Sequence, residues 1–189
     1  MSDRIGRGLI TSARVMLGEA AAARDVDGSR GALQLSFLGL ALALVMDAGI
    51  LSIDQSGEGR VRFFLWLMPL GLMSYAAAIA VILVLAREAG PRARFPAWLA
   101  AQNWGEAVLG AAFLVPRWIQ VSMPPVRVEG AQVTGSPLVE IVIFVGLAVF
   151  TFVARYRLLV HVLGVTGVRA VWMIVAAYAA AILTTAVMA

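Results

Sequence analysis

The chain contains no cysteine and no lysine, and it has a single histidine, His161. Without cysteine it can form no disulfide framework, thiol nucleophile or thiolate metal site. One histidine cannot supply a bis-histidine haem or a multi-histidine zinc site. No Ser/His/Asp arrangement and no GxSxG turn is found among the polar residues. We therefore expect no cofactor, no metal ion and no enzymatic activity.

Charge is also scarce. Of the 189 residues, 14% are charged and 61% are hydrophobic, whereas a soluble domain is typically about 25% charged and about 45–50% apolar. The excess apolar content needs an apolar environment, and stretches of about 20 apolar residues can cross a bilayer core of about 30 Å. The composition therefore predicts an all-α, polytopic integral membrane bundle.

Five segments are long and apolar enough to be predicted as transmembrane helices. They cover residues 31–53, 62–86, 96–118, 137–157 and 168–188. The third segment is the least certain of the five by hydropathy, because Gln102, Asn103 and Glu106 sit within it. Ser29 is predicted to cap the first span, and the prolines and glycines of 119–136 predict a loop.

The first 30 residues are more polar than the rest. We expect 1–30 to be a cytoplasmic N-terminal segment and 31–189 to be the transmembrane domain. Within the first segment, residues 3–23 have the pattern of an amphipathic helix, with Ile5 and Leu9 near one face and Arg4 and Arg7 on others. Such a helix could lie at the membrane interface, and a partly ordered polar tail is the alternative.

The arginines predict the orientation, because cytoplasmic loops of membrane proteins are enriched in basic residues. With the N-terminus inside, the cytoplasmic segments hold Arg4, Arg7, Arg14, Arg24, Arg30, Arg87, Arg92, Arg94, Arg155, Arg157 and Arg169. The outside holds only Arg60, Arg62, Arg117 and Arg127. This predicts a multi-pass protein of a bacterial inner membrane, with its C-terminus in the periplasm.

The same distribution bears on the partners. The arginines flank apolar segments, which is the pattern of membrane loops, so we expect no nucleic-acid partner. The expected partners are the lipid bilayer and either other membrane subunits or further copies of this chain.

An intramembrane polar cluster is predicted in the third span. Gln102, Asn103 and Glu106 share one helix face, because their spacings are i,i+4 and i,i+3. Tyr75 and Tyr178 are expected at a similar depth. A charged carboxylate near the midplane costs at least about 2.5–3.5 kcal/mol, and no arginine is expected there. We therefore predict a neutral, hydrogen-bonded Glu106 that either joins helices together or relays a proton or an ion.

A second group of residues is predicted at the cytoplasmic interface. It consists of Arg155, Arg157, His161 and Arg169, around a turn or short interfacial helix at 158–167. We expect His161 to be structural. Asp47 is an acidic residue inside the first span, and it lies nearer the outer end, which leaves a gap between it and Glu106.

Two motifs carry a resemblance to a known family. The third span opens with the run Phe95-Pro96-Ala97-Trp98-Leu99-Ala100-Ala101-Gln102-Asn103-Trp104 and ends with Leu114-Val115-Pro116. The last cytoplasmic corner contains Arg155-Tyr156-Arg157 and then Leu163-Gly164-Val165-Thr166-Gly167-Val168-Arg169-Ala170. From Arg30 to Met188 the layout resembles the Yip family, five-span membrane proteins named for interaction with Rab-type GTPases, and its bacterial Yip-like members.

The resemblance implies a non-enzymatic membrane protein of Yip-like architecture that acts as a scaffold or accessory subunit. The alternative is a small oligomeric transporter or ion-conducting protein that uses Gln102, Asn103 and Glu106.

Overall fold

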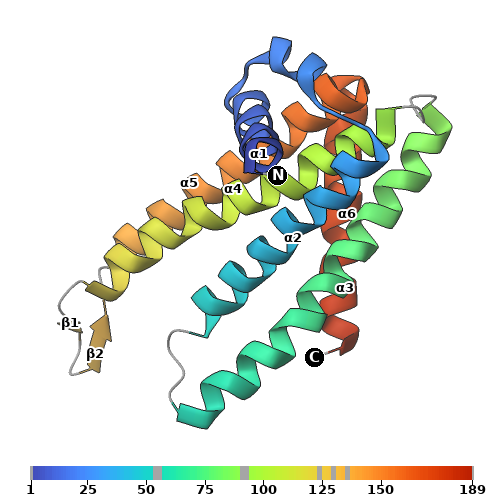
Figure 1. Cartoon of the computed structure of the whole chain (residues 1–189). Coiled ribbons are helices and arrows are strands. Elements are labelled where there is room, and N and C mark those ends of the chain that lie inside the picture. The colour runs from blue at the N-terminus through green and yellow to red at the C-terminus, as the bar shows by residue number, and fades with distance from the viewer. Residues whose placement is uncertain are drawn as a thin grey trace.

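A computed structural model of the chain describes residues 2–52, 57–89, 94–122, 125–128, 131–134 and 137–188. Helices form most of it (Figure 1). In chain order the elements are α1 (Ser2–Leu17), the 3₁₀ helix η1 (Ala20–Asp25), α2 (Arg30–Leu51), α3 (Gly57–Ala89), α4 (Phe95–Ser122), β1 (Pro125–Val128), β2 (Ala131–Thr134), α5 (Pro137–Arg157), the π-helical segment η3 (Leu158–Leu163) and α6 (Gly167–Met188).

Four helical segments in the described part of the chain are long and apolar enough to cross a membrane. They are Arg30–Ile50, Gly57–Arg87, Ile141–Leu163 and Gly167–Met188. The chain is therefore a helical protein suited to a membrane. Helix α4, which contains the predicted third span, is not among the four. Its 28 residues would be about 42 Å long, so its polar side chains and not its length set it apart.

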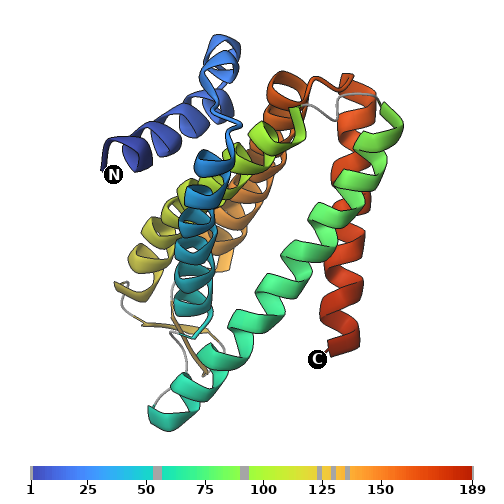
Figure 2. The ribbon, with the colours of Figure 1, turned by 45° about the vertical axis from the view of Figure 1, so that its right-hand side comes forward.

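The long helices run side by side between two ends of the molecule (Figures 1 and 2). The C-terminal end of α3, the start of α4 and the turn between η3 and α6 lie at the end near α1. The end of α2, the start of α3, the strands and the C-terminus lie at the other end. Helix α2 packs most extensively on α4, and α3 on α6. The two pairs diverge with distance from α1 (Figure 2).

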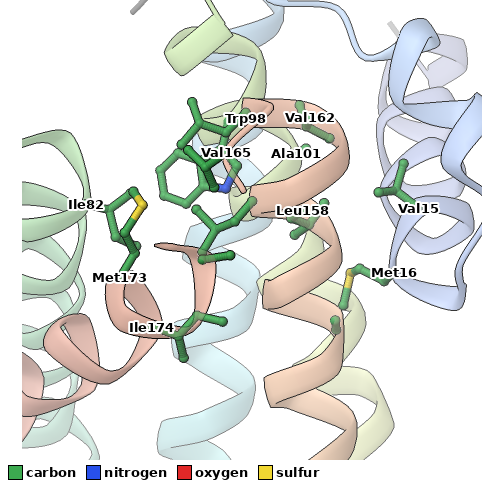
Figure 3. Packing of buried hydrophobic residues seen from close by; sticks show 14 of the residues in the cluster. Val15, Met16, Ile82, Trp98, Ala101, Leu158, Val162, Val165, Met173 and Ile174 are labelled. Atoms are coloured by element: carbon green, nitrogen blue, oxygen red, sulfur yellow. The ribbon is translucent and has the colours of Figure 1, made fainter. Parts of the chain in front are cut away.

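Helix α1 ends earlier than the predicted boundary of 23. Gly18 has a φ of +110°, a left-handed conformation that favours glycine and stops the helix, and η1 follows it. Val15 and Met16 of α1 are buried and face Leu158 (Figure 3). A Cβ on Gly105 of α4 would lie 3.0 Å from the sulfur of Met16. One face of α1 therefore packs on the bundle.

The predicted all-helical bundle is confirmed for the long elements, but the segment 119–136 is not wholly a loop. Helix α4 continues to Ser122, and β1 pairs with β2 as a short antiparallel ladder in which Val126 lies opposite Val133. β-branched residues favour strands, and both strands contain them. The fold is therefore a helical bundle with one two-stranded β-hairpin.

The apolar core lies at the α1 end of the bundle (Figure 3). Trp98, Leu158, Leu163 and Met173 are almost completely buried there. Lipid tails are as apolar as these side chains, so inside a bilayer such a core is stabilised by close packing and not by transfer from water. The core joins α1, α4, η3 and α6, and it places the polar groups described below just beyond it.

Candidate functional site: an ion pair between two cavities

Glu106 of α4 forms an ion pair with Arg155 of α5. Nη2 of Arg155 donates to Oε1 of Glu106 at 2.8 Å and to Oε2 at 3.0 Å. Nε2 of Gln102 donates to the same Oε1. The side chains of Glu106 and Arg155 are 13% and 27% exposed. Such charge-assisted hydrogen bonds are stronger than neutral ones, and Glu106 is a paired carboxylate where the sequence predicted a neutral one.

Arg155 reaches Glu106 because the helix continues beyond residue 157. A turn or short helix was predicted at 158–167, and η3 with the turn after it is such a segment, although η3 directly continues α5. The expectation of no arginine at the depth of Glu106 was wrong. The π-helical η3 extends the helix to Leu163, so Arg155 lies roughly 10 Å before its end. Gly164, with a φ of +81°, then stops it. The guanidinium also stacks over the ring of Tyr178, 5.0 Å from the ring centre.

Asn103 is the centre of a second polar cluster, whose hydrogen bonds join three helices. Its Nδ2 donates to Oγ of Ser36 on α2 at 2.8 Å, and its Oδ1 accepts from the hydroxyl of Tyr75 on α3 at 2.6 Å. Ser36 in turn donates to the carbonyl of Leu33 at 2.7 Å. Asn103 is fully buried, so these bonds replace those that it loses to water.

A close approach of α2 and α4 makes the hydrogen bonds of Asn103 possible. A Cβ on Gly39 of α2 would lie 2.6 Å from Cε3 of Trp104 and 2.9 Å from the carbonyl oxygen of Asn103. A Cβ on Gly110 would lie 2.9 Å from Cε of Met46. At Gly39 a larger residue would meet an aromatic ring and a backbone oxygen, so glycine is required there, whereas at Gly110 only the flexible end of Met46 would have to move. The close contact at Gly39 brings Ser36 within reach of Asn103.

Two cavities lie on either side of the Glu106–Arg155 pair. One of about 260 Å³ lies among α2, α3, α4 and α6, and the other, of about 540 Å³, among α2, α4, α5 and α6. Four side chains line both: Asp47, Glu106, Arg155 and Tyr178. Asp47 is exposed, so it stands where the cavities open. The sequence predicted a gap between Asp47 and Glu106, but the two residues share both cavities.

Some buried polar atoms beside the cavities lack a hydrogen-bond partner among the described residues. They are Nε1 of Trp98, Oγ1 of Thr151 and Nε of Arg155. Trp98 lines the smaller cavity and Thr151 the larger. Buried polar groups are usually paired, so these atoms mark where another molecule can bind.

The other residues predicted at the cytoplasmic interface stay apart from the ion pair. Arg157 donates from Nη1 to the carbonyl of Met16 at 2.7 Å, which satisfies one of the free carbonyls at the end of α1. His161 is half-buried within η3, and Arg169 is exposed in the first turn of α6. They lie at the α1 end of the molecule.

The connection between α1 and α2 has its own polar contacts. Oγ of Ser29 accepts from the amide of Ala32 at 3.2 Å, so Ser29 caps α2 as predicted. The amide of Ser29 donates to Oδ1 of Asp27 at 2.8 Å. This hydrogen bond, with one from the Ser29 side chain, lowers the pKa of Asp27 below its ordinary value. The ion pair with Arg14 likewise lowers the pKa of Glu19.

Neither a metal site among the described residues nor a match to a known protein indicates the function. Within the described residues no three His, Asp or Glu side chains gather closely enough to hold a metal ion. The chain matches no protein-family model, no curated protein and no solved structure. The resemblance to the Yip family therefore stays a prediction that rests on the two motifs of the third span and the last cytoplasmic corner.

Proposed function

We propose that this chain is a small membrane carrier that moves a cation or a proton along a path built on Asp47, Glu106 and Arg155. The observation that supports it best is that all three line the same two cavities. Ionisable side chains within membrane spans are costly, and they often mark substrate or ion pathways. A purely structural role would explain the Glu106–Arg155 ion pair. It would not explain why a second acidic side chain, Asp47, lines the same cavities.

A carrier fits better than an open channel. Trp98, Leu159 and Ile174 line the smaller cavity and are almost completely buried. They lie toward the α1 end, whereas Asp47 lies near the opposite end of α2. A dry apolar layer blocks a charged species. The path is therefore closed at the α1 end, and transport requires a rearrangement of this layer.

The proposed membrane arrangement has five crossings, with α4 as the fifth. The two ends of α4 lie toward opposite ends of the molecule (Figures 1 and 2), and the distribution of arginines favours a cytoplasmic N-terminus and a periplasmic C-terminus. This would be the inner membrane of a bacterium. Helix α1 would then lie at the cytoplasmic interface, with its exposed Ile10 and Leu17 in contact with lipid.

The carrier proposal is tested by reconstituting the purified protein into liposomes that contain a pH-sensitive dye. We expect flux of protons or of an imposed cation above that of empty liposomes, and its loss in Asp47→Asn. Asp47 is exposed, so its replacement by an isosteric amide should leave the fold intact. Asp3→Asn, at an exposed position of α1, is the matched control. Flux equal to that of empty liposomes under every imposed cation gradient would contradict the proposal.

A second proposal is the scaffold or accessory subunit of Yip-like architecture. The specific observation is the apolar face of α5, on which Ile141, Val142, Phe144, Val145 and Val149 are all more than half exposed. Inside a bilayer such a face contacts lipid or another apolar helix, including one from a second copy of the chain. Stable co-purification of a membrane subunit in mild detergent, lost when Phe144 and Val145 become alanine, is the expected result.

A further inference from the structure

The larger of the two cavities has the form of a site for a small organic molecule. Its volume of about 540 Å³ lies within the range of about 300–1,000 Å³ that is typical of such sites. Three aromatic rings line it, those of Phe113, Phe152 and Tyr178, together with Leu109 and Ala148. Only a few polar groups converge on these apolar walls, and this combination is typical of binding sites.

The formal charge of the cavity lining is negative. Asp47 and Glu106 are acidic and Arg155 is basic. Both oxygens of Glu106 accept from Arg155, so these two charges neutralise each other. The carboxylate of Asp47 has no hydrogen-bond partner among the described residues. One negative charge therefore remains for a bound molecule, beside aromatic rings that attract cations through their faces.

Two polar atoms beside the aromatic walls also lack partners in the described part of the chain. They are Oγ1 of Thr151, a residue that is 9% exposed, and Nε of Arg155. Nε of Arg155 can only donate, and the threonine hydroxyl can donate or accept. Both would be satisfied by an oxygen atom of a bound molecule.

We propose that this cavity binds a small organic ammonium ion that also carries a hydroxyl or carbonyl oxygen. The ammonium group pairs with Asp47, the carbon skeleton packs against Phe113 and Phe152, and the oxygen accepts from Nε of Arg155 and bonds Oγ1 of Thr151. The inference rests on the proposed function and names the class of cation that the carrier moves.

Other classes of ligand fit the lining less well. Hard metal cations prefer several oxygen ligands, whereas the described lining offers a single unpaired carboxylate and the hydroxyls of Thr151 and Tyr178 among apolar groups. An anion would be repelled by Asp47, and Arg155 is already paired with Glu106. A neutral apolar molecule would leave the charge of Asp47 unpaired.

The test uses isothermal titration calorimetry on the full-length protein in lipid nanodiscs, with empty nanodiscs subtracted. The probes are protonated 2-amino-1-phenylethanol, protonated phenethylamine, which lacks its hydroxyl, neutral 2-phenylethanol and the anion phenylacetate. We expect the amino alcohol to bind most tightly and phenylacetate not to bind. Because a hydrogen bond to a charged group is worth about 1.5–3 kcal/mol, Asp47→Asn should weaken both ammonium probes about tenfold or more.

Thr151→Val removes the hydroxyl and keeps the shape of the side chain. It should weaken the amino alcohol by about threefold or more and change phenethylamine little, because only the former has an oxygen to lose. Thr184→Val is the matched control, since the Thr184 hydroxyl already donates to the carbonyl of Ala180 at 2.8 Å. Circular dichroism and gel filtration check that each variant is folded.

The outcomes separate this inference from the carrier proposal. Equal or tighter binding of 2-phenylethanol or phenylacetate, or ammonium binding that survives Asp47→Asn, overturns the ammonium site. Cation or proton flux that depends on Asp47, without binding of either ammonium probe, overturns the site and leaves the carrier proposal standing. Absence of both flux and binding overturns both.

Discussion

Helices α3 and α4 are of similar length but differ in what surrounds them. Leu65, Leu72 and Val84 of α3 are about half exposed or more, and this helix is one of the four that are apolar enough to cross a membrane. In α4, by contrast, Gln102 and Asn103 are buried by the other helices. A high mean hydropathy therefore accompanies many exposed apolar side chains, and a helix whose polar side chains are buried by its neighbours can have a lower one.

The largest effect expected from this difference comes from breaking the charge pair of α4. Arg155→Met leaves the carboxylate of Glu106 without its partner. Loss of one member of a fully buried pair costs about 3–5 kcal/mol, and because this pair is partly exposed we expect a loss at or below the lower end of that range. Unfolding in mixed detergent micelles measures this free energy. The double variant Glu106→Gln/Arg155→Met should recover most of the loss, because no unpaired charge remains.

The control for this pair is Arg169→Met, on an exposed side chain of α6, which should change stability by less than about 0.5 kcal/mol. If Arg155→Met were no more costly than this control, Glu106 would not be a charged, paired group, and α4 would not depend on α5 to hold its carboxylate inside the bundle.

The next effect concerns the packing of α2 on α4. Gly39→Ala places a methyl group 2.6 Å from Trp104, and such overpacking costs about 1–3 kcal/mol. Gly49→Ala, on the same helix, meets nothing within 4 Å. It should be neutral or stabilise by up to about 1 kcal/mol, because alanine favours a helix. Equal stability of the two variants in the same assay would show that α4 is not held closely against α2.

The smallest effect concerns the hydroxyl groups of α3. Tyr75→Phe removes the hydrogen bond to Asn103, and single interhelical bonds in membranes are worth about 0.6 kcal/mol on average. Ser74→Ala removes the more exposed bond to Thr185, and we expect a smaller loss. A larger loss for Ser74→Ala would place the important polar contact of α3 on α6 instead of α4.

Much of the helical layout follows from the sequence, because runs of about 20 apolar residues leave few alternatives. The predicted first and fifth spans, 31–53 and 168–188, differ by only one or two residues from α2 and α6. Ser29 is also the N-cap that its sequence context predicted.

The position of Arg155 could not be predicted from the pattern of charges. An arginine near the end of an apolar run usually lies at the interface, so Arg155 was predicted at the cytoplasmic interface. The run Leu158-Leu159-Val160 continues the apolar pattern beyond Arg157 and was the one signal that the helix extends further. Pairings such as Ser36 with Asn103 depend on how α2 docks against α4, which no local pattern specifies.

The absence of cysteine allows the central claim, that polar α4 crosses the membrane, to be tested without a background of native thiols. Single variants Gln132→Cys, Thr166→Cys and Met188→Cys are treated in intact spheroplasts with a maleimide that cannot cross membranes. If α4 crosses, residues 132 and 188 are labelled from outside, and residue 166 is labelled only after the membrane is permeabilised. Labelling of residue 166 from outside, with residues 132 and 188 protected, would contradict the claim.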